Sequence, residues 1–251
     1  FNNKSFKNVF FFYNEGIEYK YNEKNNLFEV FQKTKYGRGF FINGDIKNVK
    51  INFIGKSGNF DLDAANRFDK KNLTGCLSFI KSSFKNVELE ASNSNCEDGI
   101  NLVNTTGNIN KILSKNSLYD GLDIDFSSLT IDDIEINNSL NDCLDFSFGN
   151  YFVKNLELNY CGDKGISVGE KSVAKFKIAN ISNSNIGIAS KDSSSTDVDN
   201  LNIINTKICV SAYKKKQEFT GAILKIINSH CEDYNKKMDV DKNSKIIFVK
   251  E

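Results

Sequence analysis

The chain of 251 residues contains no proline, no tryptophan, one methionine and a single histidine, His230. That histidine lies near the C-terminus, which argues against Ser-His-Asp and Cys-His catalysis because both need a histidine beside the nucleophile. None of the six cysteines forms a Cys-x-x-Cys pair, so no structural zinc site is expected. No stretch approaches the roughly 18 uninterrupted apolar residues of a membrane-spanning helix, and we therefore expect no membrane span.

A surplus of charge of one sign is also missing. The 33 lysines and arginines nearly balance the 32 aspartates and glutamates, and the formal net charge is +1. A dedicated nucleic-acid binder normally carries a basic surplus, so nucleic acid is not an expected partner. The charge is nevertheless uneven, because ten acidic residues and only two lysines lie between Glu97 and Asp145. This segment is an acidic band.

The six cysteines are too sparse in a chain of this length for a disulfide framework. We interpret most of them as buried free thiols, since cysteine is among the most buried residue types and packs like a small apolar side chain. The sequence leaves the redox compartment open. The chain begins with Phe1 and shows no basic-then-apolar leader, so we interpret it as a processed chain or a piece of a longer one.

A repeat of 22 residues organises the middle of the chain. Small residues recur at this spacing, at Gly99, Gly121, Cys143, Gly165, Gly187 and Cys209. An apolar residue follows each of them, at Ile100, Leu122, Leu144, Ile166, Ile188 and Val210. Self-similarity at a fixed period of this size indicates a repeat architecture.

Each repeat also contains short alternating segments, such as Ile134-Glu135-Ile136 and Leu156-Glu157-Leu158. Period-two alternation predicts strands, and no segment sustains a long helical pattern. A unit this small buries its apolar face only by stacking on its neighbours, at about 4.8 Å per coil. The sequence therefore predicts an all-β fold, a single right-handed parallel β-helix (solenoid) with coils of about 22 residues, rather than a propeller or a leucine-rich repeat.

The regularity of the repeat divides the chain into three parts. We expect irregular capping coils over residues 1–60, the regular parallel β-helix over residues 61–212, and a basic C-terminal coil and cap over residues 213–251. Caps are expected because an uncovered coil offers strand edges and core to other chains.

Alternation along a strand assigns a direction to each column of the repeat. Leu122 and Ile124 are expected in the core, and Gly121, Asp123 and Asp125 are expected to face solvent. One outward column then consists of Asn101, Asp123, Asp145, Ser167, Ala189 and Ser211. A second consists of Asp98, Asp120, Asp142 and Lys164.

Stacked carboxylates repel one another. At a separation of about 4.8 Å the repulsion is about 0.9 kcal/mol in water and about 3.5 kcal/mol at an effective dielectric constant of about 20. A bound cation, a shared proton or Lys164 would relieve it. The alternative is that Asp98, Asp120 and Asp142 only cap turns through hydrogen bonds from their side chains to the backbone.

Two consecutive coils carry a family resemblance. The run Asn141-Asp142-Cys143-Leu144-Asp145, followed one coil later by Gly162-Asp163-Lys164-Gly165-Ile166-Ser167, resembles the catalytic coils of polygalacturonase-type glycoside hydrolases in the pectin-lyase-like β-helix superfamily. The resemblance implies that Asp142 is an acidic catalytic position and that Lys164 stands where the family has a histidine. Asn141 replaces the first of the family's paired aspartates. The segment also resembles β-helix regions of large bacterial surface proteins.

These features define a candidate site. Its candidate catalytic residues are Asp142, Asp145, Asp123 and Lys164. Its candidate substrate-binding residues are Asp120, Asp125, Asp163, Glu170, Lys171 and Lys191. Hydrolysis needs a carboxylic acid and a base or nucleophile, about 5.5 Å apart for retention or about 6.5–9.5 Å apart for inversion.

Lyase or epimerase chemistry instead needs a base beside a uronate carboxyl, with positive charge or a metal on that carboxyl. Lys164, held protonated by Asp142 and Asp163, suits this neutralising role. Tyr119, Tyr160 and Tyr213 are alternative acids. A Ca²⁺ ion would suit the oxygen ligands of the acidic face, although the sequence defines no ligand set.

We predict a β-helix domain that binds and processes an acidic or surface polysaccharide, by hydrolase, lyase or epimerase chemistry. Acidic coils that give way to basic ones, at Glu170-Lys171 and Lys191, would hold an anionic glycan along the axis. The alternative is a non-catalytic structural or adhesion module of a larger bacterial surface protein, with other domains as partners. Both place the chain outside the cell or on its surface. A face walled by loops would favour the enzyme, and a flat bare face the module.

Overall fold

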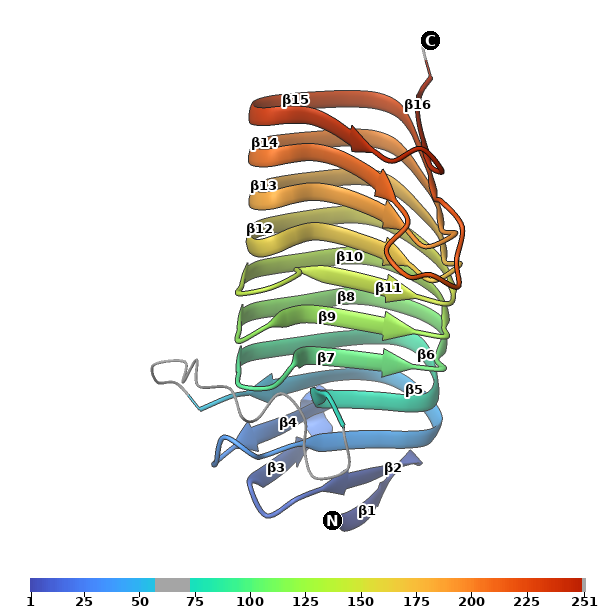
Figure 1. Cartoon of the computed structure of the whole chain (residues 1–251). Helices are drawn as coiled ribbons and strands as arrows, with labels where there is room; N and C mark the ends of the chain where they lie inside the picture. The colour runs from blue at the N-terminus through green and yellow to red at the C-terminus, as the bar shows by residue number, and fades with distance from the viewer. Residues whose placement is uncertain (57–72, 250–251) are drawn as a thin grey trace.

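The computed structural model describes residues 1–56 and 73–249. The chain forms a right-handed parallel β-helix of about nine turns, with 77% of the described residues in strands and 1% in helix. Figure 1 shows the coils stacked along one axis, with the N-terminal strands at one end and β15 and β16 at the other. In the part of the chain that the structure describes, no helix is long and apolar enough to cross a membrane. The predicted fold is confirmed.

All strands belong to one sheet that winds around the axis. The four N-terminal strands and one short 3-10 helix are β1 (Asn2–Phe6), β2 (Asn8–Tyr13), β3 (Ile17–Asn22), η1 (Glu23–Asn25) and β4 (Leu27–Gln32). The strands of the coils are β5 (Gly39–Ile54), β6 (Gly75–Ser94), β7 (Asp98–Val103), β8 (Thr106–Ser117), β9 (Asp120–Asp125), β10 (Ser128–Ser139), β11 (Leu144–Ser147), β12 (Asn150–Gly169), β13 (Val173–Lys191), β14 (Ser195–Tyr213), β15 (Ile223–Val240) and β16 (Lys245–Phe248).

The N-terminal strands close the first coil. β1 and β2 form an antiparallel hairpin, β2 pairs antiparallel with β5, and β3 pairs antiparallel with β4. Parallel pairing begins with β4 and β5 and continues from β5 to β6. Aromatic rings fill the core of this end, among them Phe6, Phe11, Phe28 and Phe41. The expected boundary between residues 60 and 61 lies outside the described residues.

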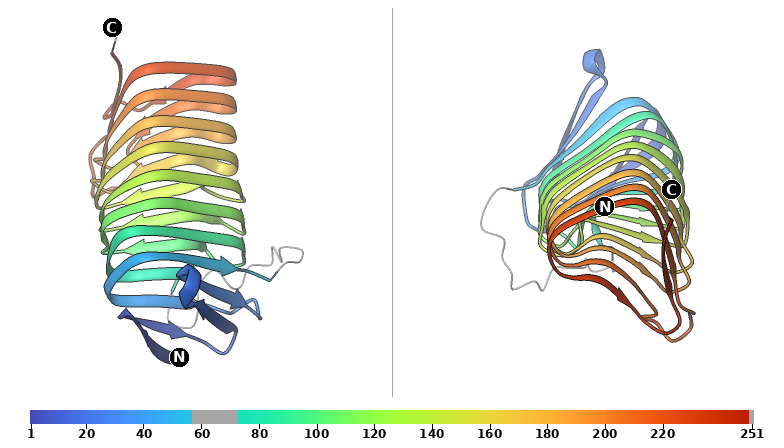
Figure 2. Two further views of the ribbon diagram at one scale, coloured as in Figure 1. Left: turned by 180° about the vertical axis from the view of Figure 1, so that it is seen from behind. Right: turned by 90° about the horizontal axis from the view of Figure 1, so that it is seen from above.

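Residues 22 apart lie one above another, as the repeat predicts. Leu144 pairs with Leu122 on one side and with Ile166 on the other, and Asp145 pairs with Asp123. Leu122, Leu144 and Ile166 are fully buried, so the apolar column is a continuous part of the core. Figure 2 shows this regular stacking from behind and from above.

The expectation that Gly121 faces solvent is wrong. A Cβ at this position would lie 2.6 Å from Cγ2 of Ile136 and 2.7 Å from Oγ of Ser139, both in the interior. The chain bends here, so Gly121 and Leu122 face the core in succession. The recurring small residue is therefore a packing requirement, and a Cβ at Gly165 would likewise lie 2.5 Å from Cγ2 of Ile181.

A second corner of the coil is built from asparagine in the left-handed conformation. Asn116, Asn138, Asn183 and Asn205 have φ angles of 55°, 66°, 57° and 56°. Asparagine tolerates this conformation better than most residues, and its amide bonds to the coil below, as from Asn138 Nδ2 to Asn116 Oδ1 at 3.0 Å. Tyr160, with a φ of 56°, interrupts this asparagine ladder.

The interpretation of the cysteines as free thiols is wrong. The structure pairs all six, as Cys76–Cys96, Cys143–Cys161 and Cys209–Cys231. Each bridge crosses the interior within about one turn, because its partners are separated by 20, 18 and 22 residues. A cross-link that closes a loop of this size stabilises the folded chain by about 3 kcal/mol.

The C-terminal end is only partly covered by the described residues. β16 pairs with Ile223, Leu224, Lys225 and Ile226 at the start of β15 and leaves the rest of that strand without a further strand. Met238 is 49% exposed, although Val210, its partner in the coil below, is fully buried. The expected C-terminal cap is therefore incomplete in this part of the chain.

We expect purified protein to contain no free thiol before reduction. Alkylation without reductant, followed by mass spectrometry, should leave all six cysteines unmodified, and reduction should expose them. Replacing Cys143 and Cys161 together with serine should lower the free energy of unfolding by about 3 kcal/mol because one closed loop is lost. Alkylation of most cysteines in the unreduced folded protein would contradict this pairing.

Candidate functional site

The candidate site lies on the face formed by β7, β9, β11 and the C-terminal parts of β12, β13 and β14. Two outward columns run along this face. The first contains Asn101, Asp123, Asp145, Ser167, Ala189 and Ser211. The second, two residues further along each strand, contains Val103, Asp125, Ser147, Gly169, Lys191 and Tyr213. Asp123, Asp125 and Asp145 of the acidic band therefore share one face with Lys191.

A separate column beside the bend has a structural role. Oδ1 of Asp120 accepts a hydrogen bond of 2.9 Å from the backbone nitrogen of Asp142, and Oδ1 of Asp142 accepts one of 3.0 Å from the backbone nitrogen of Lys164. Asp120 and Asp142 are buried, and burial raises the pKa of each carboxyl. These side chains therefore connect consecutive coils. The alternative prediction was that they cap turns through hydrogen bonds to the backbone. They do accept such bonds, but from the next coil and not from their own turn.

Lys164 neutralises the end of this column. Its Nζ lies 3.3 Å from Oδ1 of Asp142 and also bonds to Asp163. Burial alone would lower the pKa of Lys164, but the charges of Asp142 and Asp163 outweigh it, and the pKa is raised. The expectation that its neighbours hold Lys164 protonated is confirmed, and this ammonium group is unsuited to take up a proton.

Asp123 and Asp125 lie on the open strand face, and neither makes an ion pair within the part of the chain that the structure describes. Burial raises the pKa of Asp123 well above its usual value, and Asp98 and Asp125 raise it further. Burial and the charges of Asp145 and Glu170 raise the pKa of Asp125 to about 6. Oδ2 of Asp123 accepts a hydrogen bond of 3.3 Å from Asn101, which holds the carboxyl in place.

Asp145 differs from Asp123 because a lysine faces it. Its Oδ2 lies 3.7 Å from Nζ of Lys191, whose stem crosses Gly169; a Cβ at Gly169 would lie 2.7 Å from Cε of Lys191. Burial raises the pKa of Asp145, and Lys191 counteracts that rise. Oδ1 of Asp145 is buried and makes no hydrogen bond of normal geometry within the described residues.

Asp98 belongs to the same cluster, although it was predicted only as part of a stacked column. It is 1% exposed, and its Oδ2 has no hydrogen-bond partner among the described residues. Burial raises the pKa of Asp98 to about 7, although a hydrogen bond with Thr74 acts in the opposite direction. The charges of Asp125 and Asp145 contribute to the rise.

Beyond Lys191 the face is closed by a loop. Residues 214–222, between β14 and β15, hang across the ends of the preceding coils (Figure 1). Nζ of Lys216 in this loop lies 2.6 Å from Oε1 of Glu170. Burial would raise the pKa of Glu170, but its hydrogen bonds, chiefly the one from Lys216, and the charges of nearby lysines together outweigh burial, and the pKa is lowered. Nζ of Lys171 lies 6.0 Å from the ring of Phe219 in the same loop. One side of the acidic face therefore has a wall.

Sequence reasoning missed two exposed aromatic residues beside the acidic cluster. Phe126 and Phe148 directly follow the outward residues Asp125 and Ser147 on β9 and β11. Their rings stack with centroids 4.8 Å apart and planes within 4°, and the two side chains are 57% and 38% exposed. Both have positive φ, 50° and 49°, which is unusual for a bulky residue. Their spacing of 22 residues was the available signal.

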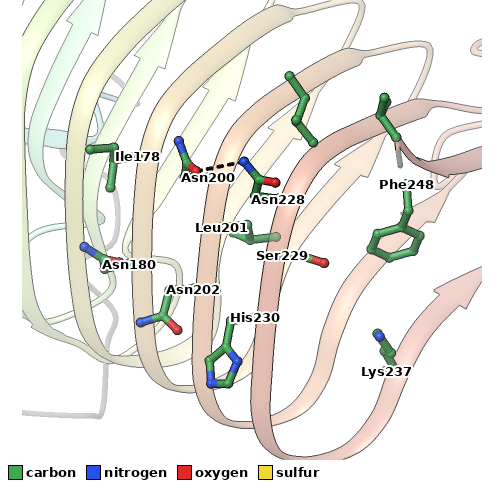
Figure 3. A pocket seen from close by; sticks show the side chains of 12 residues that line it. Ile178, Asn180, Asn200, Leu201, Asn202, Asn228, Ser229, His230, Lys237 and Phe248 are labelled. Atoms are coloured by element: carbon green, nitrogen blue, oxygen red, sulfur yellow. Dashed lines mark hydrogen bonds between the residues drawn. The ribbon is translucent and has the colours of Figure 1, made fainter. Parts of the chain in front are cut away.

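A hollow of about 600 Å³ lies on a different face of the β-helix (Figure 3). Its lining includes Asn180, Asn202, His230 and Lys237, and a second hollow of about 580 Å³ shares its two asparagines. None of the predicted site residues lines either hollow. His230 is exposed there beside Glu232, at 3.3 Å, far from the carboxylate cluster in the fold.

The acidic cluster does not form a metal-binding set. Among residues 1–56 and 73–249, no three His, Cys, Asp or Glu side chains are arranged to hold a metal ion. Carboxylates stack along the coils instead of converging on one point. No step of the chemistry below is therefore assigned to Ca²⁺.

Comparison with known proteins finds no family model that matches the chain and no curated protein with significant sequence similarity. The fold therefore defines the class of the protein, a right-handed parallel β-helix, and its chemistry has to be argued from the side chains.

Replacing Lys164 with alanine should leave the carboxylate of Asp142 buried without its cation. Breaking a buried pair in this way costs about 3–5 kcal/mol of the free energy of unfolding, measured by urea denaturation. Lys154→Ala is the matched control, because Lys154 pairs with Asp132 at the surface and such pairs contribute about 0–1 kcal/mol. The double variant Asp142→Asn/Lys164→Met should recover part of the loss. Equal effects of the two lysine substitutions would contradict the structural role.

Proposed function

We propose that this β-helix binds and hydrolyses a surface polysaccharide on its acidic face, with Asp123 as the general acid and Asp145 as the base or nucleophile. The observation that carries the proposal is the different environment of these two stacked carboxylates. Asp123 has acidic neighbours and a strongly raised pKa, whereas Asp145 faces Lys191 at 3.7 Å. Pairs of titratable groups whose surroundings separate their pKa values define acid and base roles.

The geometry of the pair is compatible with glycoside hydrolysis. Asp123 and Asp145 are register partners on adjacent strands, so their backbones are about 4.8 Å apart and their side chains point the same way. A separation of about 5–5.5 Å between the two carboxyl groups is typical of retaining enzymes. A protonated Asp123 would donate to the leaving oxygen while an ionised Asp145 attacks or activates water.

The environment of the pair supports an enzyme more than a bare rod. The loop at residues 214–222 walls one side of the face, and Phe126 and Phe148 extend it at the corner. The resemblance of residues 141–145 and 162–167 to polygalacturonase-type coils of the pectin-lyase-like superfamily points to the same chemistry. The resemblance implies catalytic roles for Asp142 and Lys164, but these two side chains bond to each other. We therefore assign the catalytic roles to Asp123 and Asp145.

An extracellular or cell-surface location of the protein is part of the proposal. Disulfides persist mainly in oxidising environments, and all six cysteines pair here. A polysaccharide of a cell surface or matrix would be met in that compartment.

A non-catalytic structural or adhesion module remains the second candidate. It is favoured by the uniform coils from β7 to β14, because a regular solenoid is a rigid rod that serves equally well as a spacer. A module of this kind does not need two carboxyl groups with different pKa values. The enzyme does, and this requirement distinguishes the two candidates.

The test is turnover of a panel of neutral, amino and uronic-acid polysaccharides, followed by reducing ends for hydrolysis and unsaturated ends for elimination. Asp123→Asn and Asp145→Asn should each lower hydrolysis by about 100-fold or more while glycan binding is kept, because general acid–base catalysis contributes about 10²–10⁴-fold. Asp133→Asn is the matched control, since Asp133 is exposed on another face and bonds to Asn155. Undiminished hydrolysis by the double variant would contradict the assignment, and glycan binding without any turnover would favour the module.

A further inference from the structure

Among residues 1–56 and 73–249, the acidic face has fewer lysines than carboxylates. Each buried or half-buried lysine near it already has its own acidic partner: Lys164 pairs with Asp142 and Asp163, Lys191 with Asp145, and Lys216 with Glu170. Within the described residues, no ion pair is made by Asp98, Asp120, Asp123 or Asp125. Positive charge from outside the chain would therefore be stabilised here, and an anionic sugar would be repelled.

One of these carboxylates is buried with only one of its two oxygens left without a hydrogen-bond partner among the described residues. Asp98 is 1% exposed, and no described group donates a hydrogen bond to its Oδ2. It lies in the cluster, because its charge is the strongest acidic influence on Asp123 and it also affects Asp120. A buried polar atom without a partner costs about 1–3 kcal/mol, which a donor from a ligand would recover.

The aromatic stack supplies a second, independent feature at the same place. Phe126 and Phe148 occupy a corner of the coil at which the chain has a positive φ. One coil earlier, 22 residues before Phe126, the same corner is occupied by Asn104. Backbone strain of this kind persists where the surroundings hold it, often at ligand sites. The exposed rings form a flat apolar surface directly after Asp125, and ring faces attract cations.

We infer that the polysaccharide handled at this face carries free amino groups, with a hexosamine ring packed on Phe126 and Phe148 and its ammonium group directed to Asp125 and Asp98, while Asp123 keeps the proton of the general acid. This inference rests on the proposed function and names the substrate class of the same site. The aromatic stack takes the apolar face of the sugar ring, and the unpaired carboxylates take its charge.

The experiment measures binding of three hexasaccharides by isothermal titration calorimetry, to the whole chain with its disulfides intact. They are β-1,4-linked glucosamine, its N-acetylated counterpart and oligogalacturonate, the last with and without Ca²⁺. Glucosamine should bind at least about tenfold more tightly than the acetylated oligomer, since a charge-assisted hydrogen bond contributes about 1.5–3 kcal/mol. Oligogalacturonate should bind most weakly under both conditions.

Two variants locate the contacts. Phe148→Asn should weaken binding of both the glucosamine and the acetylated oligomer by at least about fivefold, because it removes the stack while asparagine suits the positive φ of this corner. Asp125→Asn should remove most of the preference for glucosamine, so that the two oligomers bind with similar affinity. Phe248→Ala and Asp133→Asn are controls, an exposed aromatic residue and an exposed acid on other faces. Circular dichroism of each variant checks that the β-helix is retained.

Several outcomes would overturn the inference. Equal or tighter binding of the acetylated oligomer would do so, as would tight binding of oligogalacturonate that depends on Ca²⁺. Either result would leave a glycan-binding face and thus the proposed function intact. Absence of binding and turnover with every oligosaccharide would instead contradict the proposed function and the inference together.

Discussion

The structure depends on one constraint, the register of the parallel hydrogen-bond ladder from coil to coil. From β7 to β14 the backbone of each coil pairs with the next at a spacing of 22 residues, except for 23 where β12 pairs with β13 over residues 150–161. The spacing is 38 between β5 and β6, 23 from β6 to β7 and β8, and 28 between β14 and β15. Side chains in one column therefore have the same neighbours above and below. The column through Leu122 and Leu144 becomes core, and the column through Asp123 and Asp145 becomes a row of acids.

The same register that buries apolar side chains creates an electrostatic problem, and the chain resolves it in two ways. Beside the bend, Asp120 and Asp142 accept backbone hydrogen bonds from the next coil, and Lys164 ends the column with a positive charge. On the open face, burial and the charges of Asp98 and Asp125 raise the pKa of Asp123, whereas Lys191 reaches back to Asp145. The first solution stabilises the fold. The second leaves two neighbouring carboxylates in different surroundings, which is the basis of the proposed chemistry.

Much of the fold was accessible from the sequence because the columns from Gly99 to Cys209 keep a spacing of 22 residues. The column at Leu122 and Leu144 and the pairing of Asp123 with Asp145 follow directly from the spacing. The inward direction of Gly121 did not, because simple alternation fails where the strand bends. Periodicity also gave no access to the disulfides, since Cys143 and Cys161 are 18 residues apart and meet across the interior of a coil.

The grouping of the candidate residues was predictable from the sequence, but the surroundings of each side chain were not. The 22-residue spacing predicts which aspartates are neighbours. It does not predict that Asp145 forms an ion pair with Lys191, which lies two coils away. Asp145 differs from Asp123 in having a lysine beside it, because the side chain of Lys191 passes over Gly169 to reach it. Likewise, the spacing of Phe126 and Phe148 is visible in the sequence, whereas their exposure depends on the left-handed corner.

The most direct test of this account is an NMR titration of the carboxyl carbons of Asp123 and Asp145, in the unmodified protein and in Asp145→Asn. Register stacking predicts that Asp123 titrates well above the usual range of about 3.9 for aspartate, and that its pKa falls when the neighbouring charge is removed. An ordinary pKa for Asp123 that is the same in both proteins would contradict the central claim that these two carboxylates form one interacting pair.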